Sequence, residues 1–260
     1  MTTSTASRRS RFHQRFLVEL RVIPAATRRR TLTVGWVLLG LGVVAFAALA
    51  AQVVTGTGIT ALDPGVAEWF REERFAEGTV VMDTLATVFG PVFLPIIIVA
   101  VLLVWFLVAR HLWRPVLLAS GTLFGVICVQ IAAHLVQRPR PPVEYMLLGA
   151  DGTFSFPSGH VTGVSDFFLL LAYLLVSRRP SRLAWIGGFA VAAAMIACQI
   201  VARLYLGYHW LSDTLASVSI AVAILGAVIL IDTARTTRSS ESSESSAREA
   251  VREQGVGREA

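Results

Sequence analysis

The sequence contains no lysine, only two cysteines, and few charged residues, which make up 15% of the chain. Cys128 and Cys198 each lie inside an apolar run, so a disulfide framework, an iron–sulfur cluster and a thiolate zinc site are all poorly supported. The chain also lacks a glycine-rich nucleotide loop and a dense acidic cluster. These absences argue against a nucleotide-driven pump and against a metal site bridged by carboxylates.

Apolar residues dominate what is present. They make up 55% of the 260 residues, and the mean hydropathy is +0.65, which is too high for an ordinary soluble domain. A bilayer core of roughly 30 Å needs about 20 helical residues, so long apolar runs predict membrane spans. Gly90, Pro91 and Pro95 predict a break within the second run. The six runs cover residues 31–54, 80–109, 115–136, 160–176, 183–202 and 213–231.

The arginines predict how the chain crosses the membrane, because short cytoplasmic segments retain basic residues. They gather before the first run, between the second and third runs, and between the fourth and fifth. We therefore expect a multi-pass plasma-membrane protein with both termini in the cytoplasm. The first run is interpreted as an uncleaved span, because its basic leader is long for a signal peptide. Three parts are expected: a basic cytoplasmic segment (1–30), a six-helix membrane domain (31–232) and a disordered cytoplasmic tail (233–260).

Three polar clusters fall on the outer face in this topology. The first follows the third run and contains Arg138 and Arg140 among three prolines, Pro139, Pro141 and Pro142. Prolines end the helix there and hold the two guanidinium groups in an extended segment, where they can bind an oxyanion. Interfacial snorkelling of the arginines explains this cluster about as well.

The second cluster is the sequence Phe-Pro-Ser-Gly-His that ends at His160, directly before the fourth run. Ser158 has the residue type and position of a helix N-cap, and Gly159 lets another group approach the backbone. Free N–H groups at a helix N-terminus bind anions, and His160 is then positioned to donate a proton to a departing oxygen. The alternative is a plain helix start with an incidental histidine.

The third cluster runs from Arg203 to Asp213, between the fifth and sixth runs. His209 and Asp213 are four residues apart, so in a helix the carboxylate would accept the proton of one imidazole nitrogen and make the other more nucleophilic. The alternative for Asp213 is a simple acidic residue at a helix N-terminus.

The three clusters together resemble the type 2 phosphatidic acid phosphatase (PAP2) superfamily of membrane lipid phosphatases. The family pattern has a lysine, six residues and Arg-Pro; then Pro-Ser-Gly-His; then Ser-Arg, five residues, His, three residues and Asp. Arg140-Pro141 match the end of the first motif, and residues 157–160 match the second in full. In the third motif, Arg203, His209 and Asp213 match at the family spacing.

The resemblance implies an all-α fold, a bundle of six transmembrane helices with the helical core shared by PAP2 phosphatases and haloperoxidases. It implies that His209 attacks phosphorus to form a phosphohistidine, that Asp213 orients His209, and that His160 protonates the leaving group. It also implies that no metal and no cofactor take part. The implied phosphate-binding groups are Arg140, Arg203, Ser158 and Gly159.

Two positions depart from the family pattern. Ala133 stands where the motif has lysine, and Ala202 where it has serine. His134 is adjacent to the first position and Arg138 lies near it, so either is a candidate for the missing positive charge. By analogy with removed oxyanion donors, the loss of one such ligand costs on the order of a hundredfold to a thousandfold in rate.

The first hypothesis is therefore a membrane phosphatase that acts on a lipid phosphate or pyrophosphate at the outer face. Undecaprenyl and other polyprenyl pyrophosphates, or phosphatidate-type lipids, are the substrates that the resemblance implies, and no nucleic-acid partner is expected. A lipid phosphotransferase and a non-catalytic lipid-phosphate binder or transporter are the alternatives. A vanadium haloperoxidase has a similar motif pattern, but those relatives are typically soluble and do not need six spans.

Overall fold

The computed structural model describes residues 21–108 and 112–239, and predictions for residues 1–20, 109–111 and 240–260 lie outside them. Within these ranges the chain forms eight α-helices, two short 3-10 helices and two short strands. In chain order they are β1 (Arg21–Ile23), α2 (Ala25–Thr55), η1 (Gly58–Leu62), α3 (Asp63–Glu72), α4 (Ala76–Val88), α5 (Phe93–Val108), α6 (Trp113–Val136), η2 (Val143–Tyr145), α7 (Gly159–Val176), α8 (Arg182–Tyr205), α9 (Leu211–Thr236) and β2 (Thr237–Ser239).

The predicted all-helical membrane bundle is confirmed. Five helices (α2, α6, α7, α8 and α9) are long and apolar enough to cross a membrane, and α4 and α5 together supply a sixth candidate span. The predicted break is also present, because the axes of α4 and α5 differ by 54°. Gly90 and Pro91 lie between the two helices, and Pro95 lies in the first turn of α5, where its missing N–H breaks no helical hydrogen bond.

The ends of the membrane domain differ from the predicted boundaries. Helix α2 already begins at Ala25, and α9 continues to Thr236, past the boundary predicted at residue 232. Beyond the helices, β1 pairs in parallel with β2, with Val22 opposite Arg238. Apolar runs of membrane length do not indicate this pair, because its strands are only three residues long.

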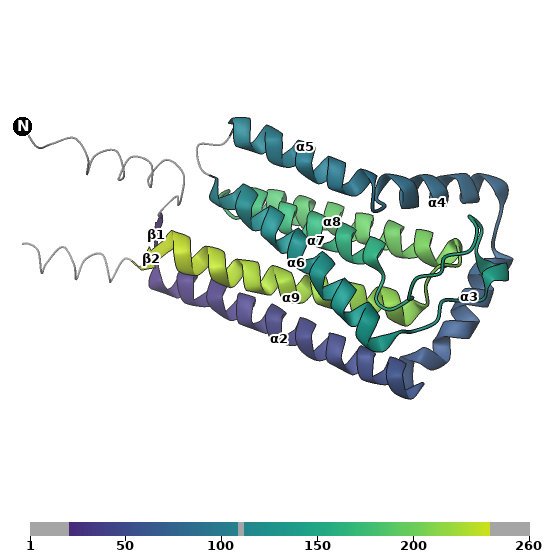
Figure 1. The fold of residues 1–260 in the computed structure, drawn as a ribbon. Coiled ribbons are helices and arrows are strands. Elements are labelled where there is room, and N and C mark those ends of the chain that lie inside the picture. The colour runs from purple at the N-terminus through teal and green to yellow at the C-terminus, as the bar shows by residue number, and fades with distance from the viewer. Residues whose placement is uncertain (1–20, 109–111, 240–260) are drawn as a thin grey trace, which may run out of the picture.

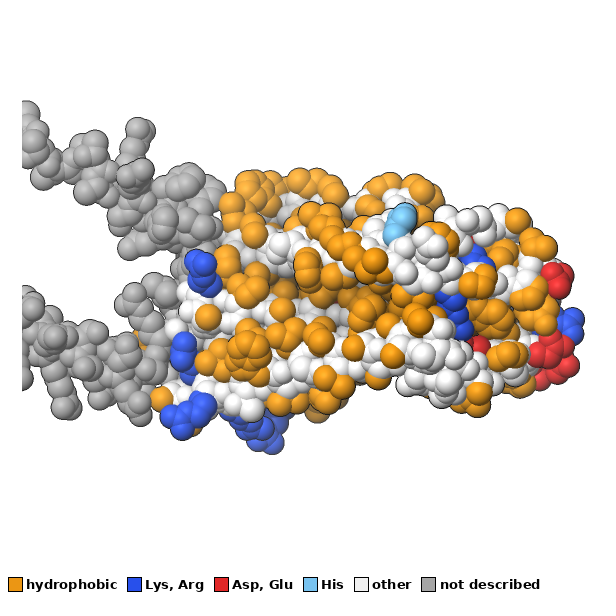
Figure 2. All heavy atoms as spheres, turned by 60° about the horizontal axis from the view of Figure 1, so that its bottom comes forward, with side chains coloured by type: hydrophobic (Ala, Val, Ile, Leu, Met, Phe, Trp, Pro, Cys, Tyr) orange, Lys and Arg blue, Asp and Glu red, His pale blue; other side chains and the backbone are white. Residues whose placement is uncertain are grey.

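Helix α7 forms the centre of the bundle (Figure 1). In its most apolar window 61% of the residues are buried, whereas the corresponding values are 11% for α8 and 6% for α2. Phe167, Leu170 and Leu174 of α7 belong to the main apolar core, together with residues of α6 and α9. The outer helices expose large apolar side chains along their length (Figure 2). Such a surface is expected where helices face lipid tails rather than water.

Glycines allow α2 and α9 to pack closely. A Cβ atom at Gly42 would lie 2.6 Å from the carbonyl oxygen of Ser219, and one at Gly226 would lie 2.7 Å from that of Gly35. Small residues at helix crossings are a common means of close packing in membranes, where the hydrophobic effect does not drive helices together. This contact joins the first span to the last.

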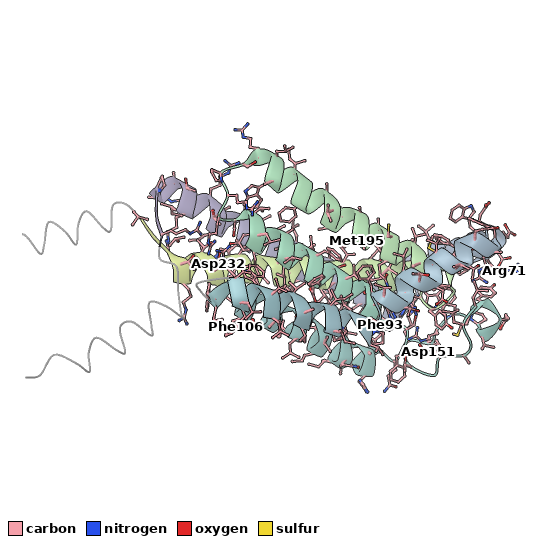
Figure 3. All side chains as sticks on the ribbon, turned by 90° about the horizontal axis from the view of Figure 1, so that it is seen from above. Arg71, Phe93, Phe106, Asp151, Met195 and Asp232 are labelled. Atoms are coloured by element: carbon pink, nitrogen blue, oxygen red, sulfur yellow. The ribbon has the colours of Figure 1, made fainter. Side chains whose placement is uncertain are left out.

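An ion-pair network ties the helices together at the end of the bundle near β1 and β2. Asp232 of α9 accepts hydrogen bonds from both Nη atoms of Arg178, each at 2.9 Å. It also accepts from the hydroxyl of Tyr173 at 2.9 Å and from the indole of Trp113 at 3.1 Å. Asp151 lies at the opposite end of the bundle (Figure 3). The two polar ends are thus separated by the apolar length of the helices.

The close contact at Gly42 predicts that a large side chain at this position in α2 destabilises the fold. Gly42→Leu should destabilise the fold by roughly 2 kcal/mol, because the side chain would overlap the α9 backbone. Gly40→Leu is the matched control, since a Cβ atom there meets nothing within 4 Å. Melting temperatures in detergent measure the difference. Equal melting temperatures for the two variants would contradict the proposed packing role.

Candidate active site

The three polar clusters of the sequence meet at the end of the bundle opposite β1 and β2. The segment after α6, the N-terminus of α7 and the turn between α8 and α9 lie together there (Figure 1). Helices α6 and α8 run toward this end, and α7 and α9 start from it. The predicted site residues on these segments are Arg138, Arg140, Ser158, Gly159, His160, Arg203, His209 and Asp213.

The imidazole of His209 is buried and held in one orientation. Its Nδ1 atom lies 2.8 Å from the carbonyl oxygen of Ser155. Because a carbonyl oxygen only accepts hydrogen bonds, Nδ1 carries the hydrogen, and neutral His209 then has its lone pair on Nε2. Nη1 of Arg140 donates to Nε2 at 3.2 Å. The Nε2 atom of His209 therefore faces the guanidinium of Arg140.

Electrostatics keep His209 neutral. Burial is the main cause, and with the positive charges of Arg203 and Arg140 it holds the pKa of His209 well below its ordinary value of 6.5. A neutral imidazole keeps a lone pair on one ring nitrogen, which an attack on phosphorus requires.

Asp213 does not accept the imidazole proton, which corrects the prediction made from the four-residue spacing. Its Oδ2 atom lies 3.6 Å from Nδ1 of His209, and Ser155 accepts that hydrogen instead. The prediction assumed a helix from His209 to Asp213, but α9 begins only at Leu211. Asp213 accepts from the backbone N–H of Trp210 at 2.8 Å, so it also caps the helix.

Ser155 is a site residue that sequence analysis missed. Its hydroxyl donates to Oδ2 of Asp213, and its carbonyl accepts from His209. Its backbone N–H donates to the carbonyl of Arg138 at 2.9 Å. Ser155 thus links the acid to the histidine. Its only signal in the sequence was its proximity to residues 157–160, since its role depends on a backbone carbonyl that any residue type carries.

Arg140 lies at the centre of the site. Its Nη1 atom donates to the carbonyl of Tyr208 at 2.7 Å, beside the contact with His209. Its Nη2 atom donates to the hydroxyl of Thr153 at 2.7 Å and pairs with the carboxylate of Asp151 at 2.9 Å. The guanidinium thus already binds one carboxylate, which is the type of group that a phosphate would replace.

Asp151 is a second residue that the sequence did not single out. Partial burial opposes its ionisation, but hydrogen bonds from Thr153 and the charge of Arg140 hold its pKa below the usual value. It is therefore negatively charged at neutral pH, within electrostatic reach of His209. A phosphate that binds Arg140 would experience this charge.

Arg203 lies in the last turn of α8 and is 5% exposed. Its guanidinium stacks over the ring of Tyr208 at 4.6 Å from the centroid. The buried Nε atom has no hydrogen-bond partner among residues 21–108 and 112–239. Because a buried charged donor without a partner is costly, this side chain is suited to bind an anion.

The N-terminus of α7 has the predicted geometry. Ser158 is its N-cap, and its hydroxyl accepts the N–H of Val161 at 3.4 Å. Gly159 is the first helical residue, and the nearest atom that a Cβ there would meet is 3.8 Å away, on Val129. His160 follows and lies within electrostatic reach of Arg203, His209 and Arg140. The N-terminus of α7 thus lies near the side chains of Arg203, His209 and Arg140.

The two candidates for the missing lysine charge occupy different environments. Nδ1 of His134 lies 2.8 Å from the carbonyl of Gln130, and its exposed ring packs against Phe154. The side chain of Arg138 instead forms ion pairs with Asp63 and Asp213.

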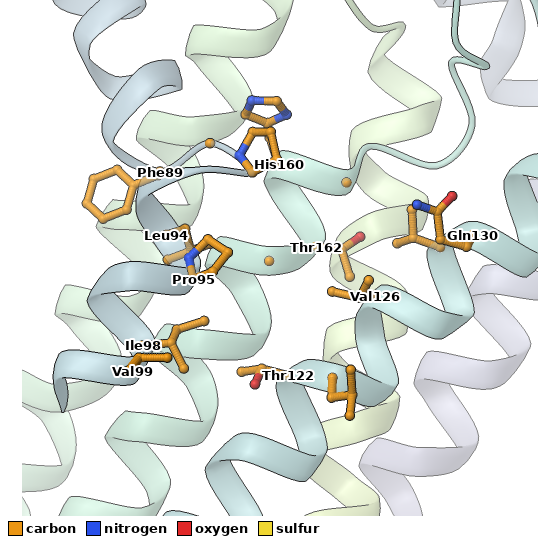
Figure 4. A pocket seen from close by; sticks show the side chains of 16 residues that line it. Phe89, Leu94, Pro95, Ile98, Val99, Thr122, Val126, Gln130, His160 and Thr162 are labelled. Carbon is orange, nitrogen blue, oxygen red and sulfur yellow. The ribbon is translucent and has the colours of Figure 1, made fainter. Parts of the chain in front are cut away.

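An apolar groove of about 460 Å³ leads to His160 (Figure 4). The turn between α4 and α5, the first half of α5, and parts of α6 and α7 form its walls. Leu94, Ile98 and Val126 line the groove, and His160 lies at one end of it.

Comparisons with known proteins agree with this architecture. Residues 114–237 match the model of the PAP2 superfamily, and this range contains all three motifs. The match confirms the resemblance that the motifs carry. The chain is also 29% identical over 94 residues to phosphatidylglycerophosphatase B of Bacillus subtilis (strain 168), a match that covers 36% of this chain and 45% of that protein. The aligned region thus spans less than half of that relative.

A solved structure has the same fold. The crystal structure of a transmembrane PAP2-type phosphatidylglycerolphosphate phosphatase from Bacillus subtilis superposes with a TM-score of 0.65 at 23% sequence identity. The superposition covers 72% of this chain and 92% of the other.

The hydrogen bond to Ser155 predicts the tautomer of His209, and the surroundings of the ring predict that it stays neutral. The protein is labelled with ¹⁵N-histidine, and the NMR signal of His209 is assigned with a His209→Gln variant. This signal should show hydrogen on Nδ1 at pH 7. It should remain neutral as the pH falls below 6.5, because burial and the nearby arginines oppose protonation. Protonation of His209 at or above pH 6.5 would contradict this electrostatic account.

The ion pair between Asp151 and Arg140 predicts that the protein binds phosphate more tightly when the charge of Asp151 is removed. Asp151→Asn keeps an acceptor for Thr153 but removes the anion beside Arg140, so inorganic phosphate should bind roughly fivefold more tightly. Glu144→Gln is the control, because it removes an exposed charge from the same loop. Calorimetric titration measures both. Weaker phosphate binding to Asp151→Asn would mean that Asp151 chiefly positions Arg140.

Proposed function

Because residues 114–237 match the model of the PAP2 superfamily, we propose that the protein is a membrane phosphatase that removes a phosphate group from a lipid phosphate or pyrophosphate. The observation that carries this proposal is the state of His209. The imidazole is buried and neutral, and its Nε2 lone pair faces Arg140. A protein that only bound lipid phosphate would need the arginines but not an oriented nucleophile.

The reaction has two steps. In the first, Nε2 of His209 attacks phosphorus, the bond from phosphorus to the lipid oxygen breaks, and protonated His160 donates a proton to that oxygen. In the second, water attacks the phosphohistidine while His160 accepts a proton, and inorganic phosphate leaves. Arg140, Arg203 and the N-terminus of α7 stabilise the charge that develops on the phosphoryl oxygens, with Ser158 and Gly159 at that N-terminus.

The groove supports a lipid substrate. It is apolar, and His160, the proposed proton donor to the leaving group, lies at one end of it. A lipid tail in the groove would hold the ester or pyrophosphate oxygen beside this histidine while the head group contacts Arg140. Phosphatidate, phosphatidylglycerol phosphate and polyprenyl pyrophosphate all combine an apolar tail with a terminal phosphate. The name of the Bacillus relative, phosphatidylglycerophosphatase B, makes phosphatidylglycerol phosphate the first substrate to test.

The orientation is part of the proposal. The site lies at the end of the bundle opposite Arg178, Arg179 and Arg182, which by their positive charge belong on the cytoplasmic side. The active site then faces outward from the plasma membrane, with both termini in the cytoplasm. Phosphate would be released on the outer side.

We propose that the enzyme needs no metal and no cofactor. Arg140 and Arg203 supply the positive charge that metal ions supply in many phosphoryl transfers. Throughout the described part of the chain, no group of three or more His, Cys, Asp or Glu side chains is arranged to hold a metal ion. A lipid phosphotransferase remains the second candidate, because an alcohol in place of water would intercept the same phosphohistidine.

Phosphate release by purified protein in detergent tests the proposal. The three lipids are supplied in excess chelator, and activity should persist in wild type and fall by at least about a thousandfold in His209→Ala. His134→Ala is the comparison, and its rate should stay near that of wild type because His134 is exposed and contacts Gln130 and Phe154. Release that needs a metal ion would contradict the proposed chemistry.

Transfer of phosphate to an added lipid alcohol, with no inorganic phosphate, would favour the phosphotransferase. Intact binding of lipid phosphate with no turnover in any assay would favour a non-catalytic binder.

A further inference from the structure

Asp63 is a buried acid at the start of α3, far along the chain from every motif residue. Its side chain is only 3% exposed. It accepts hydrogen bonds from the backbone N–H of Ser212 at 3.0 Å and from its hydroxyl at 2.6 Å. It also forms an ion pair with Nη2 of Arg138 at 2.7 Å. Asp63 therefore connects the segment between the first two candidate spans to the N-terminus of α9.

Arg138 joins two buried carboxylates. One Nη atom pairs with Asp63, and the other lies 2.5 Å from Oδ1 of Asp213. The same Nη1 atom donates to the hydroxyl of Ser212 at 2.7 Å, and the guanidinium lies 5.6 Å from the ring centroid of Trp210. Buried carboxylates are costly unless paired, so the single guanidinium stabilises both acids.

A continuous set of contacts leads from Asp63 to the nucleophile. Asp63 holds Arg138, Arg138 holds one oxygen of Asp213, and the other oxygen of Asp213 accepts the hydroxyl of Ser155. The carbonyl of Ser155 then accepts the hydrogen of His209 Nδ1. Each contact is partly or fully buried, so water does not readily replace any partner.

We propose that Asp63 and Arg138 are positioning residues for the reaction: through Asp213 and Ser155 they fix the orientation and tautomer of His209. The inference rests on the proposed function only for its kinetic consequence. Both guanidinium Nη atoms of Arg138 are already committed to carboxylates, whereas the Nε of Arg203 is unpartnered among the described residues. Phosphate binding is thus left to Arg140 and Arg203.

This role predicts a specific kinetic pattern. Loss of the Asp63 charge should lower kcat, because a loosely held imidazole attacks less often in the productive orientation. It should leave KM nearly unchanged, because Asp63 does not contact Arg140 or Arg203 in the structure. A residue that binds phosphate would instead raise KM when removed.

A double-mutant cycle separates the route through Arg138 from the route through Ser212. Asp63→Asn keeps an acceptor for the Ser212 N–H but no longer carries the charge that holds Arg138. We expect Asp63→Asn to lower kcat about tenfold in wild type. Adding Asp63→Asn to Arg138→Gln should lower kcat no further. In a Ser212→Ala background the full loss should remain. Arg138→Lys should not restore the rate, because a single ammonium cannot hold two carboxylates as a planar fork does.

The control is Glu72→Gln, which removes an exposed charge from the same helix and should leave kcat unchanged. Melting temperatures of all variants show whether a loss of rate reflects unfolding. The ¹⁵N signal of His209 is the second readout and needs no activity: Asp63→Asn and Arg138→Gln should each produce a mixture of tautomers, and Glu72→Gln should not.

Three outcomes would overturn the proposal. The first is an unchanged kcat in Asp63→Asn. The second is a loss of kcat from Asp63→Asn that is as large in the Arg138→Gln background as in wild type. The third is a raised KM at constant kcat in Arg138→Gln. An inactive wild type would instead reject the proposed phosphatase function. In that case the positioning role is decided by the ¹⁵N signal, and a single Nδ1–H tautomer in Asp63→Asn would overturn it.

Discussion

The hydrogen bond from His209 to the carbonyl of Ser155 is the contact on which the site depends. It determines which imidazole nitrogen carries hydrogen, and so directs the Nε2 lone pair toward Arg140. A carbonyl oxygen has no charge to lose and cannot itself be protonated near neutral pH. The acid of the motif, Asp213, acts one step further away by holding Ser155.

The fold makes this contact possible by gathering distant segments at one end of a membrane bundle. Helices α6 and α8 end there, and α7 and α9 begin there, so two helix N-termini and two basic chain segments converge. The opposite end is tied by the Asp232 network, and the glycine contact between α2 and α9 joins the first span to the last.

Much of the fold could be predicted from the sequence, because membrane spans depend mainly on local composition and length. The break near Gly90 and the N-cap at Ser158 were also predictable, since each depends on the residue type at one position. The convergence of the three clusters followed from the alternation of spans.

The finer geometry of the site could not be predicted in the same way. Ser155 acts through its backbone carbonyl, which every residue type has, and Asp63 and Asp151 reach the site only through tertiary contacts. The four-residue spacing of His209 and Asp213 misled the prediction because the helix begins between them. Arg138 was predicted to bind phosphate, but in the structure its guanidinium pairs with two carboxylates, and we propose a positioning role for it instead.

Direct detection of a phosphorylated intermediate tests the central claim most sharply. Protein mixed with a radiolabelled lipid phosphate is quenched within one turnover, digested at alkaline pH, and the labelled peptide is sequenced. The account predicts acid-labile, alkali-stable label on the peptide that contains His209, because the phosphorus is bonded to nitrogen. Phosphate release during turnover with no label on His209, or with label on another residue, would contradict it.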